Sequence, residues 1–261
     1  MSQTKGYVDS EYLQAAARLL HPAKQRSYAF MHMQPGHRVL DVGCGPGTDT
    51  IALGQIVGAT GQVCGVDYDA AMVAEADRQA ENAGGGGWVR HWQADAASLP
   101  WEADEFDACR SERLFQHLLN PAQALAEMAR VTKPGGWVVV LDTDWGSLSV
   151  DTEETDIERR LACFHAQRCL HNGFSGRQLY RLFRRQDLVD VSIETIPTAV
   201  TSCTVARLIA TLDRVEGEAL AAGAITEQEL ERWRTSLERA DAEGVFFASA
   251  SLVLVGGRKA R

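Results

Sequence analysis

The sequence lacks the features that would assign it to a membrane or to nucleic acid. No apolar run approaches the roughly 20 residues that cross a bilayer, and the first ten residues, MSQTKGYVDS, contain no basic segment followed by an apolar stretch. Basic residues are in the minority, with 26 Lys and Arg against 35 Asp and Glu, a net charge of -9. This balance disfavours a broad positive groove for nucleic acid. We therefore expect a cytoplasmic protein with neither a membrane nor a nucleic-acid partner.

Paired cysteine motifs are also missing. The six cysteines are scattered through the chain, and no two of them have CxxC spacing. Reduced thiols in a cytosolic protein are the simplest interpretation. The 261 residues, 45% of them hydrophobic, are enough for one large α/β domain with small insertions.

What the sequence does contain is an alternation of apolar and helical segments. Two helices are expected first, over residues 9–20 and 22–33. Short apolar segments then alternate with helix-like segments, which predicts a parallel, doubly wound sheet. The five expected strands are 37–43, 62–69, 88–95, 106–112 and 137–144. In such sheets ligands bind beyond the carboxyl ends of the strands, where this chain places its notable polar clusters.

The pattern changes after residue 145. Residues 151–172, 176–186 and 204–242 look helical, and 189–197 and 244–256 look like strands. We therefore divide the chain into an N-terminal helical cover (1–36), a core (37–145), cap helices (146–188) and a terminal strand pair with a helical insertion (189–261, insertion 204–242). The basic helix 176–186 could attract an anion, although a solvated face is the simpler interpretation.

The stretch VLDVGCGPGTDT, residues 39–50, brings three glycines together at Gly43, Gly45 and Gly47. Such a loop lets a ligand approach the backbone closely. It departs from the dinucleotide fingerprint G-x-G-x-x-G, because Thr48 stands where the third glycine would be. The loop also lacks a Lys or Arg for phosphate. These features point to a nucleoside without pyrophosphate.

Acidic residues at the ends of the next two strands support a nucleoside ligand. Asp67 lies roughly 20 residues beyond the loop, where a carboxylate can accept bonds from both ribose hydroxyls. Asp95 ends the third strand and could accept from an exocyclic amine. Ribose and an amino-purine are therefore expected together.

Five motifs in succession extend this picture. VLDVGCGPG, GVDYD, QADAASLPW, FDACRSERLFQHL and EMARVTKPGGWVVVLD occur in that order. Together they resemble the class I S-adenosylmethionine-dependent methyltransferases, and most of all the small-molecule enzymes of the ubiquinone and menaquinone type. The resemblance is strong over about residues 35–145. It implies a Rossmann-like, mostly parallel seven-stranded α/β sheet with an antiparallel last strand and helical cap insertions.

The resemblance also assigns a donor site for S-adenosylmethionine. The glycine backbone would face the methionine and ribose, Asp41 would orient the loop near the amino group, and Tyr68 would pack beside the adenine. Ala96 would offer its N–H, and Ser111 would lie under the methionine tail. The donor-binding residues implied are Asp41, Gly43, Cys44, Gly45, Gly47, Asp67, Tyr68, Asp95, Ala96 and Ser111.

Methyl transfer requires above all that the donor and the acceptor be aligned. A general base is needed only for acceptors that must lose a proton. His117 is a candidate base, with packing after the fourth strand as the alternative. Asp142 and Asp144 could accept a proton or orient the acceptor, and Asp144 could equally cap the segment that follows. Oxygen, nitrogen and carbon acceptors all stay open.

Residues around the acceptor are harder to assign. Trp145 could stack on a flat acceptor or form a wall, and Arg113 could bind an acidic substrate or pair with Glu112. Tyr7 is expected to fold over the donor. His165 is expected to line the acceptor pocket, because CFHAQRCLH (163–171) does not bring four metal ligands to one helical face. We expect no metal site.

The expected function is methyl transfer to a small, cyclic or aromatic metabolite. The alternatives are an arsenite methyltransferase, favoured only by Cys163, Cys169 and Cys203, a donor-binding protein without turnover, and a dehydrogenase. Nucleic-acid and protein-arginine methyltransferases are disfavoured because their characteristic segments are missing. A homodimer is compatible with the sequence, which does not fix the oligomeric state.

Overall fold

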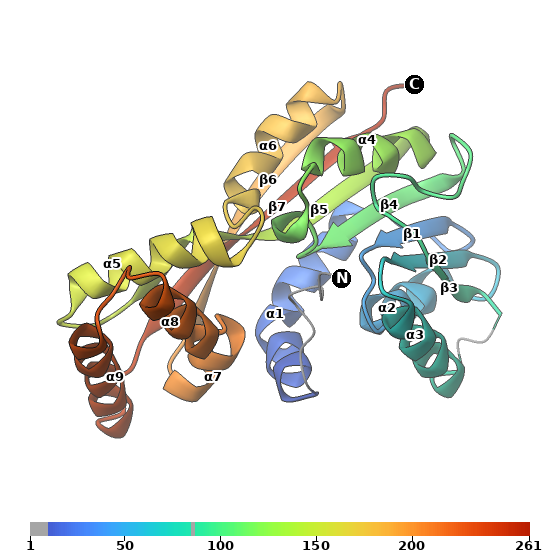
Figure 1. The fold of residues 1–261 in the computed structure, drawn as a ribbon. Helices are drawn as coiled ribbons and strands as arrows, with labels where there is room; N and C mark the ends of the chain where they lie inside the picture. Colours follow the sequence, from blue (N-terminus) through green and yellow to red (C-terminus); the bar gives the residue numbers. More distant parts are fainter. Residues whose placement is uncertain (1–9, 85–86) are drawn as a thin grey trace.

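A computed structural model describes residues 10–84 and 87–261. Their strands form one seven-stranded sheet in the order β3-β2-β1-β4-β5-β7-β6 (Figure 1). Only β7 runs antiparallel to its neighbours, β5 and β6. The strands are β1 (Arg38–Val42), β2 (Gln62–Asp67), β3 (Val89–Gln93), β4 (Phe106–Glu112), β5 (Thr132–Val150), β6 (Val189–Val200) and β7 (Ala248–Arg258). The expected Rossmann-like, mostly parallel seven-stranded sheet with an antiparallel last strand is thus confirmed.

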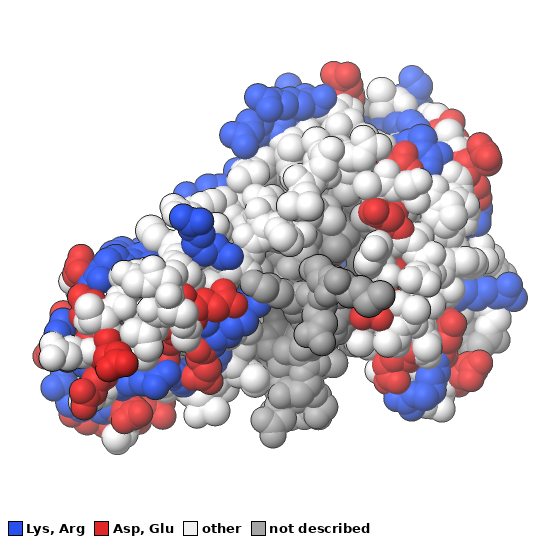
Figure 2. Space-filling view, in the orientation of Figure 1, with Lys and Arg blue, Asp and Glu red and all other residues white. Residues whose placement is uncertain are grey.

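Helices cover both faces of the sheet. On one face α1 (Ser10–Phe30), α2 (Thr48–Val57) and α3 (Ala70–Asn82) pack on the apolar side chains of the central strands. On the other face lie α4 (Pro121–Val131) and α6 (Ser175–Arg185). The central strands β1, β2 and β4 are buried on both sides, as parallel strands covered by helices must be, whereas the edge strands β3 and β6 are partly exposed. Figure 2 shows Lys and Arg side chains gathered over α6, and both signs of charge mixed over α5, α8 and α9.

A second helical layer surrounds the far ends of β5, β6 and β7 (Figure 1). It consists of α5 (Thr155–Phe164), a π-helical turn (His165–Cys169), α7 (Cys203–Ile209), α8 (Leu212–Ala221) and α9 (Glu227–Ala242). Its apolar centre includes Trp233, Leu237 and Phe246. The same cluster contains Val150 and Ala248, which lie at the ends of β5 and β7. None of the helices in the described part of the chain is long and apolar enough to cross a membrane.

Two elements differ from the sequence expectation. The two helices expected over 9–20 and 22–33 are one helix, α1, with Pro22 inside it. Packing on the sheet at Leu20, Ala23 and Tyr28 offsets the hydrogen bond that Pro22 cannot donate. Strand β5 is longer than expected because it pairs with β7 as far as Val150.

One buried carboxylate joins three helices of this second layer. Glu216 of α8 is 1% exposed. It accepts hydrogen bonds from the Trp233 indole at 2.9 Å and from Arg207 and Arg234, each at 2.8 Å. Since these residues come from α7, α8 and α9, Glu216 fixes the three helices relative to one another.

Replacing Glu216 by Ala should lower the free energy of unfolding by about 3 kcal/mol, because it leaves the buried Trp233 N–H and the Arg207 charge without their acceptor. Urea unfolding monitors this change. The matched control is Glu238→Ala on the exposed side of α9, where a change within about 0.5 kcal/mol is expected. Equal effects of the two substitutions would contradict this role of Glu216.

Candidate functional site

The glycine loop between β1 and α2 lies at the carboxyl end of the sheet. Gly43, Gly45 and Gly47 have φ angles of +77°, +52° and +82°, which side-chain-bearing residues rarely adopt. A Cβ on Gly47 would lie 2.8 Å from the Ala76 Cβ, and one on Gly43 would lie 3.0 Å from the Leu114 side chain. At Gly45 a Cβ would meet no atom of the described residues within 4 Å. Among these residues, the loop is therefore held tightly at both ends and is open at its middle.

Asp67, the last residue of β2, supports this loop. Its Oδ2 accepts a hydrogen bond from the Gly45 N–H at 2.9 Å, and its Oδ1 accepts from the Asp69 N–H at 3.0 Å. Tyr68 follows and is 68% exposed. The carboxylate thus lies beside the open part of the loop, where sequence reasoning placed the ribose.

Asp95 and Ala96 follow the neighbouring strand β3. The backbone N–H of Ala94 donates to the Asp67 carbonyl at 3.0 Å, so the two strand ends lie side by side. Asp95 Oδ1 accepts from the Ala97 N–H at 2.8 Å. The structure therefore brings the segments carrying Gly45, Asp67 and Asp95 together at one edge of the sheet.

Two further residues bear on whether S-adenosylmethionine fits. Ser111, near the end of β4 and paired in register with Val42, has a fully buried hydroxyl without a hydrogen-bond partner in the described residues. Cys44 is buried within the loop, and burial raises the pKa of its thiol, so it stays a thiol. A glycine loop open at Gly45, an adjacent carboxylate and an unsatisfied hydroxyl fit a nucleoside with a polar tail.

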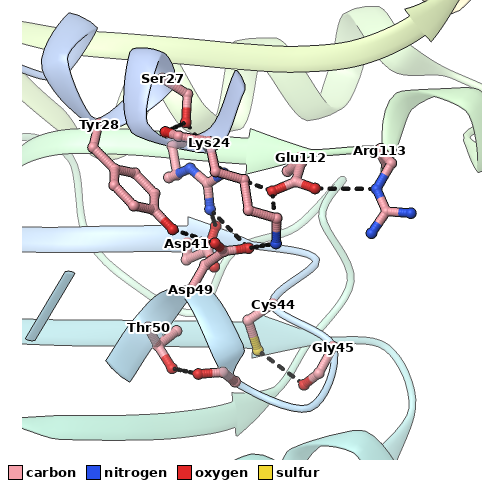
Figure 3. Close-up of polar contacts among 12 residues, drawn as sticks. Lys24, Ser27, Tyr28, Asp41, Cys44, Gly45, Asp49, Thr50, Glu112 and Arg113 are labelled. Atoms are coloured by element: carbon pink, nitrogen blue, oxygen red, sulfur yellow. Dashed lines mark hydrogen bonds and ion pairs between the residues drawn. The ribbon is translucent and has the colours of Figure 1, made fainter. Parts of the chain in front are cut away.

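A buried group of charges lies beneath the loop (Figure 3). We call it the Arg110 cluster, and it consists of Lys24, Tyr28, Asp41, Asp49, Arg110 and Glu112. Arg110 of β4 is 0% exposed, with Nη1 3.2 Å from Asp41 and Nη2 3.0 Å from Glu112. Lys24 of α1 lies 2.9 Å from Asp49 of α2 and 3.2 Å from Glu112. The cluster therefore joins α1, β1, α2 and β4.

Burial and the charges of Arg110 and Lys24 determine the pKa values of the two aspartates in this cluster. Burial raises the pKa of Asp41 to about 7, against the charge of Arg110. Burial opposes ionisation of Asp49 as well, but the charges of Arg110 and Lys24 hold its pKa below its usual range. The Tyr28 hydroxyl donates a hydrogen bond to Asp49. Asp49 is thus the fixed negative centre of the cluster.

Sequence reasoning placed the Asp41 carboxylate near the ligand's amino group, whereas the structure pairs it with Arg110 and leaves it 2% exposed. It missed Lys24, Tyr28, Asp49 and Arg110 altogether. One signal was present, because Arg110 stands in the otherwise buried strand segment FDACRSE. A charge there requires buried partners.

The residues after β4 and β5 form a connected polar chain. The Trp145 indole donates to Gln116 Oε1 at 2.6 Å, and Gln116 Nε2 lies 3.2 Å from His117 Nε2. The Trp145 ring packs against His165, with centroids 4.4 Å apart and ring planes tilted by 56°. Gln116, which sequence reasoning did not consider, therefore links Trp145 and His117, and Trp145 extends the chain of contacts to His165.

The two aspartates of β5 have different surroundings. Asp142 is 0% exposed and accepts hydrogen bonds from the backbone N–H groups of Gln116 and Thr143. Burial raises its pKa to about 7, against these bonds. Asp144 pairs with Arg177 of α6 at 2.7 Å. Asp142 thus holds the segment Phe115–His117, and Asp144 fastens α6 to β5.

The imidazoles of His117 and His165 are uncharged at neutral pH. Burial lowers the pKa of each to about 4, with the charges of Arg113, His171 and Arg214 adding to the effect at His117 and that of Arg214 at His165. His165 is 2% exposed. An uncharged His117 can accept a proton, but with a pKa this low it is a weak base.

An apolar cleft opens beside these residues, between α1, α7 and the strands β5, β6 and β7. Its volume is about 50 Å³, so it must widen to admit a metabolite. It is lined by Leu19, Leu20, Arg113, Thr143, Trp145, Leu148, Thr198, Val200, Ala206, Ile209, Ala210, Ala248, Ser249, Ala250 and Leu252. Arg113 lines the cleft and pairs with Glu112 at 3.0 Å, while the next residue, Leu114, contacts Gly43. The cleft and the glycine loop are thus neighbours.

The remaining candidates are quickly placed. Tyr7 lies outside the described residues. Cys163 is exposed, whereas Cys169 and Cys203 are buried in the apolar centre of the second helical layer. Over residues 10–84 and 87–261, no three His, Cys, Asp or Glu side chains are placed to hold a metal ion.

Comparison with known proteins agrees with this geometry. Residues 40–140 match a family model described as a methyltransferase domain. The core of this chain thus matches a methyltransferase domain, in agreement with the class I S-adenosylmethionine-dependent family that its sequence motifs resemble. The matched range includes the glycine loop, Asp67, Asp95 and the Arg110–Arg113 segment. S-adenosylmethionine is accordingly the cofactor that the loop and its carboxylates would hold.

Relatives of this methyltransferase domain extend the comparison. An uncharacterized 37.1 kDa protein in transposon TN4556 of Streptomyces fradiae is 35% identical over 222 residues, 85% of this chain and 62% of that protein. A demethylmenaquinone methyltransferase of Staphylococcus aureus is 37% identical over 130 residues, 49% of this chain and 52% of that enzyme. The chain therefore spans between about half and three-fifths of these curated relatives.

A solved structure shows the same fold. The YcgJ protein from Bacillus subtilis superposes with a TM-score of 0.65 at 20% identity, over 92% of this chain and 99% of that one. The similarity includes most of the second helical layer as well as the methyltransferase core, because it extends over nearly the whole chain.

Replacing Arg110 by Met should lower the free energy of unfolding by about 3–5 kcal/mol, because it leaves Asp41, Asp49 and Glu112 buried with too little positive charge. Urea unfolding measures the loss. Arg90→Met, on the exposed side of β3, is the matched control and should cost less than about 0.5 kcal/mol. A loss below about 1 kcal/mol at Arg110 would show that the cluster is not a structural centre.

Stability should depend on pH through His165. Its folded pKa of about 4 lies below the ordinary value of 6.5, so the unfolded chain takes up a proton first as the pH falls. The contribution of the neutral imidazole is complete above pH 6.5 and is lost towards pH 4. Relative to His165→Phe, the wild type should lose up to about 3 kcal/mol between pH 7 and 4.

Urea unfolding at several pH values tests this, with the same substitution at exposed His21 as the control. If both variants show one and the same pH dependence relative to the wild type, burial of His165 is not the cause.

Proposed function

We propose that this chain transfers the methyl group of S-adenosylmethionine to a small-molecule acceptor held in the apolar cleft. The observation that carries the proposal is the contact between the two sites through Arg113 and Leu114. A donor held by the glycine loop and an acceptor in the cleft would meet at the ends of β4 and β5.

The cleft suits this chemistry. The donor sulfonium is already activated, so the protein's main tasks are to align donor and acceptor and to exclude water. The cleft wall consists mainly of aliphatic side chains with the Trp145 ring among them. An apolar, flat acceptor is therefore the best fit, and the name of the Staphylococcus aureus relative, a demethylmenaquinone methyltransferase, supports a cyclic or aromatic one.

On the donor side, the proposed roles follow the positions of the strand ends. Asp67 binds the ribose hydroxyls, Asp95 and Ala96 bind the adenine edge, and Tyr68 packs against its ring. The hydroxyl of Ser111 binds the polar tail of the donor. Asp41 acts through Arg110 and positions the loop rather than touching the ligand.

On the acceptor side, positioning outweighs acid–base catalysis. His117 accepts the proton where the acceptor must lose one, but its low pKa limits it to acceptors that are acidic themselves or become so on methylation. Asp142 and Asp144 are positioning residues, since they hold the segments that carry His117 and Trp145. Trp145 forms the wall on which the acceptor ring stacks, and the buried His165 ring supports it from behind.

Replacing Asp67 by Ala should weaken binding of S-adenosylhomocysteine by about 10- to 100-fold, because the ribose hydroxyls and the Gly45 N–H lose a charged acceptor. Calorimetric titration measures this affinity. Glu81→Ala on the exposed side of α3 removes the same charge nearby and should change nothing. Unchanged affinity in Asp67→Ala would remove the ribose role from this residue.

The same titration, together with a methyl-transfer assay, distinguishes the proposed function from a dehydrogenase and from a binding protein without turnover. Binding of NADH in place of S-adenosylhomocysteine would indicate a dehydrogenase. Donor binding without transfer of labelled methyl to any acceptor in a metabolite extract would indicate a binding protein without turnover.

A further inference from the structure

The side chain of Arg214, in the first turn of α8, has no hydrogen-bond or ion-pair partner within residues 10–84 and 87–261, and its Nε is fully buried. A buried guanidinium nitrogen without an acceptor is costly. The nearby acids are already engaged, since Asp213 and Glu216 both bind Arg207. Among the residues that the structure describes, none therefore pairs with the Arg214 guanidinium as its counter-charge.

The position of Arg214 in its helix makes this more unusual. The first turn of a helix carries partial positive charge, which favours Asp and Glu there and disfavours Arg. Helix stability therefore gives no reason for the residue, and neither does pairing with the rest of α8. A role outside the helix is the remaining explanation.

The surroundings of Arg214 are positive. Its charge acts on the buried rings of both His117 and His165, and those of Arg113 and His171 act on His117 as well. The Nδ1 of His165 is also buried without a partner in the described residues. Two independent buried nitrogens are thus unsatisfied in one positive region.

This region lies behind the Trp145 wall of the proposed acceptor cleft. His165 packs against Trp145, and Trp145 and Arg113 both line the cleft. Leu212, which begins α8, packs in the same apolar group as Trp145. Arg214 lies in the same first turn, and its charge acts on His165, the ring that packs against Trp145.

We propose that the acceptor carries an anionic group, a carboxylate or a phosphate, which binds to Arg214 beside Trp145 and His165. The field of Arg113 adds to the attraction. The apolar body of the same acceptor lies along Trp145, Leu148 and Ile209. This inference rests on the proposed function, because it names the class of acceptor for the same cleft.

The chemistry of the site supports an oxyanion. A guanidinium presents parallel N–H donors that match the two oxygens of a carboxylate or phosphate. The Nδ1 of His165 can donate a further hydrogen bond when its tautomer carries the proton there. An anion would therefore satisfy both unpaired nitrogens and neutralise a region that the fold leaves positive.

The test compares three small probes of the same shape on the wild type, with and without saturating S-adenosylhomocysteine. Benzoate and phenyl phosphate carry the anionic groups, and benzyl alcohol is the neutral analogue. Saturation-transfer NMR titrations give the dissociation constants. We expect at least one anion to bind about tenfold or more tightly than benzyl alcohol, and the better anion identifies the head group.

Arg214→Gln should weaken binding of the preferred anion by about tenfold and leave benzyl alcohol unchanged. The fold should be retained, since Arg214 has no protein partner to lose, and an unchanged thermal transition checks this. Arg90→Gln, at the opposite edge of the sheet on β3, changes the net charge equally and should affect neither probe.

Equal affinities of the wild type for all three probes would overturn the proposal without any variant. Full anion affinity in Arg214→Gln would overturn it as well. Failure of the wild type to bind S-adenosylhomocysteine would instead refute the proposed function, and the titrations without that ligand would still judge the anion site.

Discussion

The guanidinium of Arg110 is the contact on which the donor site depends. It lies inside the sheet, at the buried centre of β4, and bonds to carboxylates from β1 and β4 at once. Lys24 adds the helix α1 to the same group through Asp49 and Glu112. The glycine loop is thereby attached at its base to four different elements, which fixes the open Gly45 opposite Asp67.

Such a cluster is a demanding way to hold a loop. Each charge loses its hydration, and the cost is offset only if all partners are present. An apolar group of similar volume would give comparable stability, but it would not specify one arrangement of α1, β1, α2 and β4. The buried charges are satisfied in few alternative arrangements of these elements. Such precision suits a methyl donor, because the donor must be aligned closely with its acceptor.

The sequence predicted best those features whose residues lie close together along the chain. The alternation of strands and helices predicted the sheet, and the glycine loop with Asp67 and Asp95 predicted a donor edge whose segments the structure brings together. Sequence reasoning failed where partners are distant: Lys24 and Asp49 are 25 residues apart, and Asp41 and Arg110 are 69 apart. Pro22 misled it too, because packing on the sheet decides the continuity of α1. No periodicity reveals such pairings, nor the unpaired Arg214.

The placement of β7 has a consequence for how such a protein can diversify. The segment α7–α9 leaves the sheet after β6 and returns at β7, so it is a closed excursion from one antiparallel hairpin. The donor loop is on the far side of β5 and does not depend on the length of that excursion. Exchange of this insert, which includes Arg214, would therefore change the set of acceptors that the proposed cleft can bind and would leave the proposed donor site unchanged.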